Sequence, residues 1–124
     1  MSYFHYNGEN LSCEDLEIKS IAQTVESPFY CYSLSCLKEN INKYKSNLKN
    51  TDSKICFSLK ANSNLEIIKT IAQEELGADV VSMGEFQKAL KAGISGKDII
   101  FSGVGKTENE IDFAIRNNCF QINA

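Results

Sequence analysis

The chain has 124 residues and a net charge of −3, with 43% hydrophobic and 23% charged residues. This length suits one ordinary domain, and the composition is that of a folded globular protein rather than a disordered one. The thirteen lysine and arginine residues are scattered, which argues against nucleic-acid binding, and no apolar run approaches the roughly 18 residues of a membrane span.

The first third of the chain predicts short elements that lead into one longer helix. A short amphipathic stretch spans 16–22, and Pro28 ends it because proline moves its predecessor away from helical backbone. An aromatic-rich strand is expected over 29–33. Apolar residues then recur at spacings of three and four, which predicts a helix capped by Ser33 or Ser35. These residues are Leu34, Leu37, Ile41, Tyr44 and Leu48.

From residue 55 onward, short apolar strands alternate with amphipathic helices. Gly77 and Gly93 are expected to end the first two of these helices. Thr107 and Glu110 form the sequence pattern of a capping box at the start of the third. The predicted strands are 55–59, 78–82, 97–102 and 119–123, and the predicted helices are 65–76, 85–92 and 108–117. Strands separated by helices indicate a parallel α/β sheet with right-handed crossovers.

Four strands make only half of a closed (β/α)8 barrel, which takes about 250 residues. We therefore expect a half-barrel with two open sheet edges, which favour pairing with another chain. The predicted division is an N-terminal segment with its strand, 1–33, followed by a partial barrel domain, 34–124. On this interpretation the chain is a truncated product and not a complete enzyme.

Lys60 is the most informative single residue. Period-two alternation places it on the polar face of its strand, at the carboxyl end, where α/β barrels carry their reactive groups. Lysine is also the side chain that condenses with aldehydes once its surroundings favour the neutral amine. The same alternation places Cys56 and Ser58 beside Lys60, and it places Ile55, Phe57 and Leu59 on the opposite face.

Three segments occur in order along the chain. These segments are Ser58-Leu59-Lys60-Ala61-Asn62, Gly77-Ala78-Asp79-Val80-Val81-Ser82-Met83-Gly84-Glu85 and Ile99-Ile100-Phe101-Ser102-Gly103-Val104-Gly105-Lys106-Thr107. Their sequence and spacing resemble the N-terminal barrel half of the diaminopimelate decarboxylases. That family belongs to the alanine-racemase-like class of pyridoxal-phosphate proteins. The resemblance extends from about residue 4 to 124, although no single motif decides it.

The resemblance implies a cofactor and three site residues. Lys60 would hold pyridoxal 5'-phosphate as an imine, Asp79 would lie beside this lysine, and Glu85 would lie near the cofactor pocket. The family converts meso-diaminopimelate to L-lysine and carbon dioxide and works as a dimer with shared active sites. The resemblance also implies that the remaining cofactor contacts lie beyond Ala124.

Asp79, Glu85 and Lys106 also have purely structural explanations. The nineteen positions from Lys60 to Asp79 fit a turn, a helix and a return to the neighbouring strand. On the structural explanation, Asp79 stands at the start of its strand and hydrogen-bonds a loop. The Glu85 carboxylate would compensate the positive end of a helix dipole from the first helical turn. The glycines around Lys106 match neither a Walker A motif nor a dinucleotide fingerprint, so Lys106 is expected to be solvated.

The five cysteines form no Cys-x-x-Cys pair, which predicts reduced thiols in a cytoplasmic protein and no metal site. Cys56 and Cys119 lie in apolar runs and are expected in the core. The residues leave three other interpretations open. The first is an inactive truncated or split-gene product. The second is a relative of arginine, ornithine or carboxynorspermidine decarboxylases, and the third is a small α/β domain that resembles the family by chance.

Overall fold

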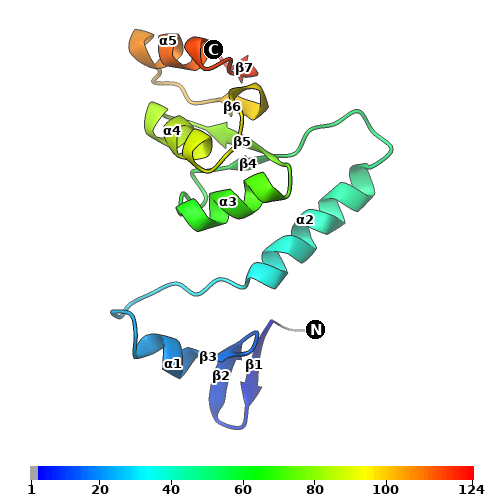
Figure 1. Ribbon diagram of the computed structural model, residues 1–124, viewed down its shortest axis with the longest axis vertical. Coiled ribbons are helices and arrows are strands. Elements are labelled where there is room, and N and C mark those ends of the chain that lie inside the picture. The colour runs from blue at the N-terminus through cyan, green and yellow to red at the C-terminus, as the bar shows by residue number, and fades with distance from the viewer. Residues whose placement is uncertain (1–2) are drawn as a thin grey trace. The chain divides into compact units, whose positions relative to one another are not determined.

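The computed structural model describes residues 3–124, which fall into two compact units that divide between Asn50 and Thr51. The first unit begins with an antiparallel sheet in the order β1-β2-β3, from Phe4–Asn7, Asn10–Cys13 and Leu16–Glu17 (Figure 1). Two helices follow, α1 at Ile18–Ala22 and α2 at Leu34–Leu48. Within the described residues, no helix is long and apolar enough to cross a membrane.

One expectation for this unit is wrong. The hairpin of β1 and β2 was not predicted, and the amphipathic stretch 16–22 divides into β3 and α1. The predicted strand at 29–33 forms no ladder. Its aromatic composition favours extended backbone, but a strand needs a neighbouring backbone, and none of the described residues pairs with it. Tyr30 consequently stays 89% exposed.

Glu14 ties the sheet of the first unit to the start of α2. It lies in the turn between β2 and β3 with a left-handed φ of 53°. Its carboxylate accepts hydrogen bonds from Ser33 Oγ at 2.6 Å and from the backbone N–H of Ser35 at 2.9 Å. These donors hold the pKa of Glu14 below its usual range. Ser33 also caps α2 through the N–H of Cys36, as expected.

The second unit is a parallel sheet in the sequential order β4-β5-β6-β7, with a helix between successive strands (Figure 1). The predicted α/β alternation is therefore confirmed. The strands are β4 Cys56–Ser58, β5 Gly77–Val80, β6 Ile99–Phe101 and β7 Gln121–Ile122. The helices are α3 Leu65–Gln73, α4 Met83–Lys91 and α5 Glu108–Arg116, with a short 3-10 turn η1 at Gly96–Asp98.

The core of this unit lies where the helices cover the sheet. Phe86 of α4 is fully buried and makes edge contacts with the rings of Phe101 and Phe113, at centroid distances of 6.0 and 5.6 Å. Such edge-to-face pairs add specificity to the burial of apolar area. Other fully buried apolar residues are Leu59, Ile68, Ala78, Val80, Ala89, Ile99 and Ala114.

The amino ends of the strands are held by close backbone packing and one ion pair. Lys54 Nζ lies 2.6 Å from Asp98 Oδ1 and 4.6 Å from the ring centre of Phe120. A Cβ on Gly77 would lie 2.4 Å from the carbonyl oxygen of Asp98, so only glycine fits there. Gly77 is the first residue of β5 and not the helix-ending residue predicted; Glu75, with φ 59°, takes the left-handed position after α3.

The cysteines are all free, as expected. Cys56 and Cys119 are only half-buried, because each stands at or before a strand end and not within the helix-covered part of the sheet. Burial still raises the pKa of both thiols. Cys13 is the buried cysteine, and its burial raises the pKa of the thiol to about 11.

Candidate functional site

Polar side chains from all four parallel strands form one hydrogen-bonded row near the carboxyl ends of the strands. Asp79 of β5 is its centre. Ser58 Oγ of β4 donates to Asp79 Oδ2 at 3.1 Å, and Ser102 Oγ, just after β6, donates to Asp79 Oδ1 at 2.5 Å. Asn123, just after β7, donates from Nδ2 to Ser102 Oγ at 3.1 Å. We call these four residues the donor row.

Lys60 is the second residue after the end of β4, at the same edge of the sheet as the donor row. Its side chain is exposed, and in the part of the chain that the structure describes its amine makes no hydrogen bond or ion pair. The strand has ended at Ser58, so Lys60 lies in a turn and not on the strand face predicted from alternation. Leu59 is fully buried, as expected for the opposite face.

Asp79 is bonded to the two residues that precede Lys60. Its side chain accepts from Ser58, and its backbone carbonyl accepts from the N–H of Leu59 at 3.0 Å. Ser58 and Asp79 are also register partners in the parallel ladder. The expected return from the Lys60 strand to a neighbouring strand at Asp79 is therefore present.

Glu85 has a structural role at the start of α4. Its Oε2 accepts a hydrogen bond from the backbone N–H of Val81 at 2.8 Å, while its own N–H donates to the capping hydroxyl of Ser82. A carboxylate in the first helical turn also compensates the positive end of the helix dipole. The structure thus brings Lys60 and Asp79 to one edge, and it gives Glu85 its partners in the turn just before its own helix.

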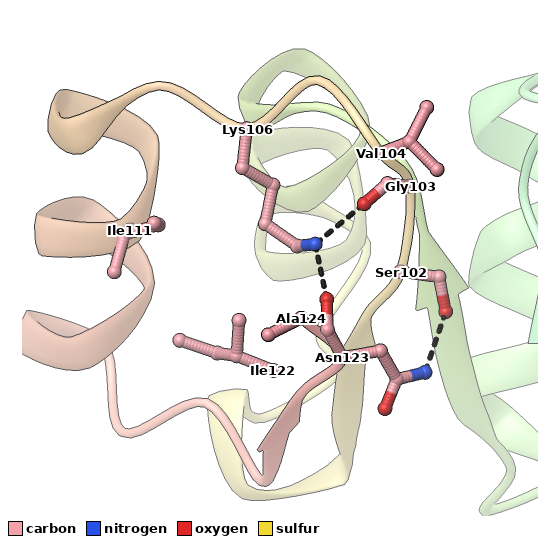
Figure 2. Close-up of a pocket in the computed structure, with 8 residues that line it drawn as sticks. All are labelled: Ser102, Gly103, Val104, Lys106, Ile111, Ile122, Asn123 and Ala124. Atoms are coloured by element: carbon pink, nitrogen blue, oxygen red, sulfur yellow. Dashed lines mark hydrogen bonds between the residues drawn. The ribbon is translucent and has the colours of Figure 1, made fainter.

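The loop after β6 forms the wall of an open hollow of about 540 Å³ (Figure 2). Lys106 is half-buried there and donates to the carbonyl oxygen of Gly103 at 2.5 Å and to that of Asn123. The prediction that Lys106 is solvated is wrong, because two backbone carbonyls replace water around its ammonium group. The hollow is lined by Ser102, Gly103, Val104, Lys106, Ile111, Ile122, Asn123 and Ala124.

Sequence reasoning missed three of the four members of the donor row as site residues. Ser58 had a signal, since alternation placed it on the polar face with Lys60. Ser102 and Asn123 each come directly after a strand, which is the position that carries functional groups in parallel sheets. Their convergence on Asp79 depends on strand order and register, and neither is written in the local sequence.

The donor set fits covalent capture of an aldehyde cofactor. Lys60 offers a primary amine with no competing partner among residues 3–124, and Asp79 holds a carboxylate at the same sheet edge. An amine and a carboxylate together can hold an aldehyde and influence the protonation of the nitrogen that binds it. Among the described residues there is no cluster of metal-binding side chains.

Comparison with known proteins places the chain in a family of pyridoxal enzymes. The profile described as "Pyridoxal-dependent decarboxylase, pyridoxal binding domain" matches residues 34–124. The diaminopimelate decarboxylase of Helicobacter pylori is 47% identical over 85% of the chain, which covers 26% of that protein. The Aquifex aeolicus enzyme of the same name is 37% identical over 98% of the chain, which covers 28% of that protein.

Solved structures agree with the sequence comparison. The diaminopimelate decarboxylase of M. jannaschii in complex with L-lysine superposes with a TM-score of 0.89 at 28% identity, over 98% of this chain and 29% of that one. The fold is the N-terminal half of a (β/α)8 barrel, as predicted. The chain spans little more than a quarter of the length of the curated relatives it matches.

Proposed function

The chain belongs to the family of pyridoxal-dependent decarboxylases, as their pyridoxal binding domain, and on this basis we propose that it is the N-terminal part of a diaminopimelate decarboxylase. The complete protein would act on meso-diaminopimelate and release L-lysine and carbon dioxide. The support is the 47% and 37% identity to two enzymes of that name. The observation that carries the proposal is the exposed amine of Lys60, which has no partner among residues 3–124 and lies two positions after Ser58 of the donor row, within the region that matches the family.

We assign the roles by position. Lys60 holds the cofactor covalently through its amine, and Asp79 fixes the segment that carries this lysine through its hydrogen bonds with Ser58 and Leu59. Glu85 acts indirectly, because it fixes the start of α4 near the carboxyl ends of the strands. Pyridoxal phosphate, when bound, supplies the electron sink that decarboxylation requires. The substrate class is a small amino acid with a free amine that can exchange with Lys60.

Two further parts of the proposal concern the surroundings of the chain. The open edges of β4 and β7 favour a partner that completes the barrel, either a further segment or another chain, and a dimer of complete barrels would be the working form.

The free cysteines support a reducing compartment, so we propose the cytoplasm as the location of the protein. The 124-residue chain alone is expected to bind the cofactor weakly and to have no decarboxylase activity.

Borohydride trapping tests the cofactor site. Pyridoxal phosphate is added to the 124-residue chain, absorbance is followed at about 420 nm, and borohydride then makes the weak, reversible attachment permanent. Mass spectrometry of the peptides should find the label predominantly on Lys60. Lys60→Arg should lose this label, whereas Lys91→Arg, at an exposed lysine in the last turn of α4, should retain it. Equal labelling of all exposed lysines would refute the assignment.

A further inference from the structure

Two cysteines meet in the first unit, where the end of β2 approaches the segment 29–33. Cys13 is the last residue of β2, and its thiol donates a hydrogen bond to the sulfur of Cys31. We propose that this pair is an oxidation site, at which a low-molecular-weight disulfide converts the two thiols to a disulfide between Cys13 and Cys31. The product would tie the antiparallel sheet to the segment that leads into α2. The inference is independent of the cofactor site.

The segment 29–33 turns Cys31 toward the protein and its tyrosines toward solvent. Exposure alternates along the segment, as it does along extended backbone. Tyr30 and Tyr32 are 89% and 58% exposed, and their rings stack with centroids 6.3 Å apart. Between and after them, Cys31 is half-buried and Ser33 is buried. Cys31 and Ser33 therefore share the inner side of the segment.

Hydrogen bonds between the neighbours of the two cysteines fix this approach. Glu14, the residue after Cys13, accepts from Ser33 Oγ at 2.6 Å and from the N–H of Ser35 at 2.9 Å. Ser33 lies two positions after Cys31, on the same side of the segment. Cys13 and Ser33 are only 6% and 7% exposed, so the junction is closely packed. The contact between the two thiols is thus held from both sides.

The two thiols have different parts in the oxidation. Cys31 is half-buried and Cys13 is buried, so the oxidant reaches Cys31 first. The Cys31 thiolate attacks one sulfur of the small disulfide, whose S–S bond breaks and releases one thiol. The Cys13 thiolate then attacks Cys31 Sγ and expels the second thiol. The two protons of the protein thiols go to the two released thiols, so one disulfide is formed and one is reduced.

The surroundings of Cys13 set the pace of the second step. Burial raises the pKa of Cys13 to about 11, and the hydrogen bond to Cys31 and the nearby Glu14 and Cys36 act in the same direction. Because the thiolate is the nucleophile, ring closure should be slow at neutral pH. Cys36 is the competing thiol, but its Sγ accepts from Asn40 Nδ2 at 3.7 Å on its own helix.

Peptide mapping of the 124-residue chain tests the pair. The reduced chain is incubated with oxidised glutathione at mildly alkaline pH, the remaining thiols are alkylated, and unreduced peptides are analysed by mass spectrometry. The disulfide between Cys13 and Cys31 should be about tenfold more abundant than any disulfide to Cys36, because disulfide geometry is specific. Cys56 and Cys119, in the second unit, should form no disulfide within the chain.

Two serine substitutions separate the pair from its neighbour. Cys13→Ser removes the second nucleophile, so glutathione should stay attached to Cys31. Cys36→Ser is the matched control and should form the same disulfide as the wild type. If Cys13→Ser fails to fold by circular dichroism, the peptide map of the wild type decides alone. A predominant disulfide to Cys36, or glutathione that persists on Cys31 of the wild type, would overturn the inference.

Discussion

A side chain does not fit at Gly96. A Cβ on this residue would lie 1.7 Å from the carbonyl oxygen of Asn117 and 2.9 Å from its carbonyl carbon. Both are backbone atoms that no rotamer change can move. We expect Gly96→Ala to lower the free energy of unfolding by about 3 kcal/mol, measured by urea denaturation of the 124-residue chain.

Gly84 provides the matched control. It is the second residue of α4, and the nearest atom to a Cβ there would be Ser82 Oγ at 3.9 Å. Alanine fits and forms helix better than glycine, so Gly84→Ala should raise stability by about 0.5 kcal/mol. If both substitutions changed the free energy of unfolding by equally small amounts, the backbone around Gly96 would accommodate a Cβ, which would contradict the prediction.

At the scale of the elements, Glu110 joins two helices. Its Oε2 accepts from the N–H and hydroxyl of Thr107, which closes the capping box of α5, and its Oε1 accepts from the N–H of Met83, the first residue of α4. The hydrogen bond from Thr107 N–H, followed by that from Met83, holds the pKa of Glu110 below its usual range.

This lowered pKa gives a pH dependence with a definite sign. The stabilisation by the Glu110 carboxylate is complete above the pKa of an unfolded glutamate, and it is lost as the pH falls through the lower pKa of the folded state. The melting temperature of the wild type should therefore be higher than that of Glu110→Gln at neutral pH, and the difference between the two melting temperatures should become smaller in acid. Thermal unfolding followed across that range by circular dichroism checks it. Glu108→Gln, at an exposed glutamate of the same helical turn, should show no such convergence.

How much of the fold the sequence predicted depends on how local each signal was. The capping box of Thr107 and Glu110 was predicted and is present, because its two residues are three positions apart and interact with their own helix. The alternation of strands and helices after residue 55 was also predicted correctly. The strand at 29–33 was wrong because propensity describes one segment, whereas a strand requires a partner.

The site was predicted less completely for the same reason. Lys60 and Asp79 were selected from segments whose spacing resembles a family, and the structure brings them to one sheet edge. Ser102 and Asn123 were missed, because they reach Asp79 only through the order and register of the strands. The environment of Lys106 was missed because its acceptors are backbone carbonyls, which no residue type reveals.

For the whole molecule, the open sheet of the second unit predicts self-association. Among the described residues, β4 and β7 each pair on one side only. Unpaired strand edges favour pairing with another chain. The mean mass of the 124-residue chain should rise with concentration in sedimentation velocity. Gln121→Lys places a charge at an exposed position of β7 and should weaken this association. A single monomeric species at all concentrations, for both proteins, would contradict the prediction.

The two ends of the parallel strands carry different kinds of residue. At the amino ends, Lys54, Gly77 and Gly96 meet backbone and ion-pair partners, whereas Lys60 and the donor row lie at the carboxyl ends. The residues at the two ends of the strands can therefore be changed independently of each other. Thermostability can be adjusted at one rim, for example by a better ion pair around Lys54, and the proposed cofactor site can be altered at the other, with little effect of one change on the other.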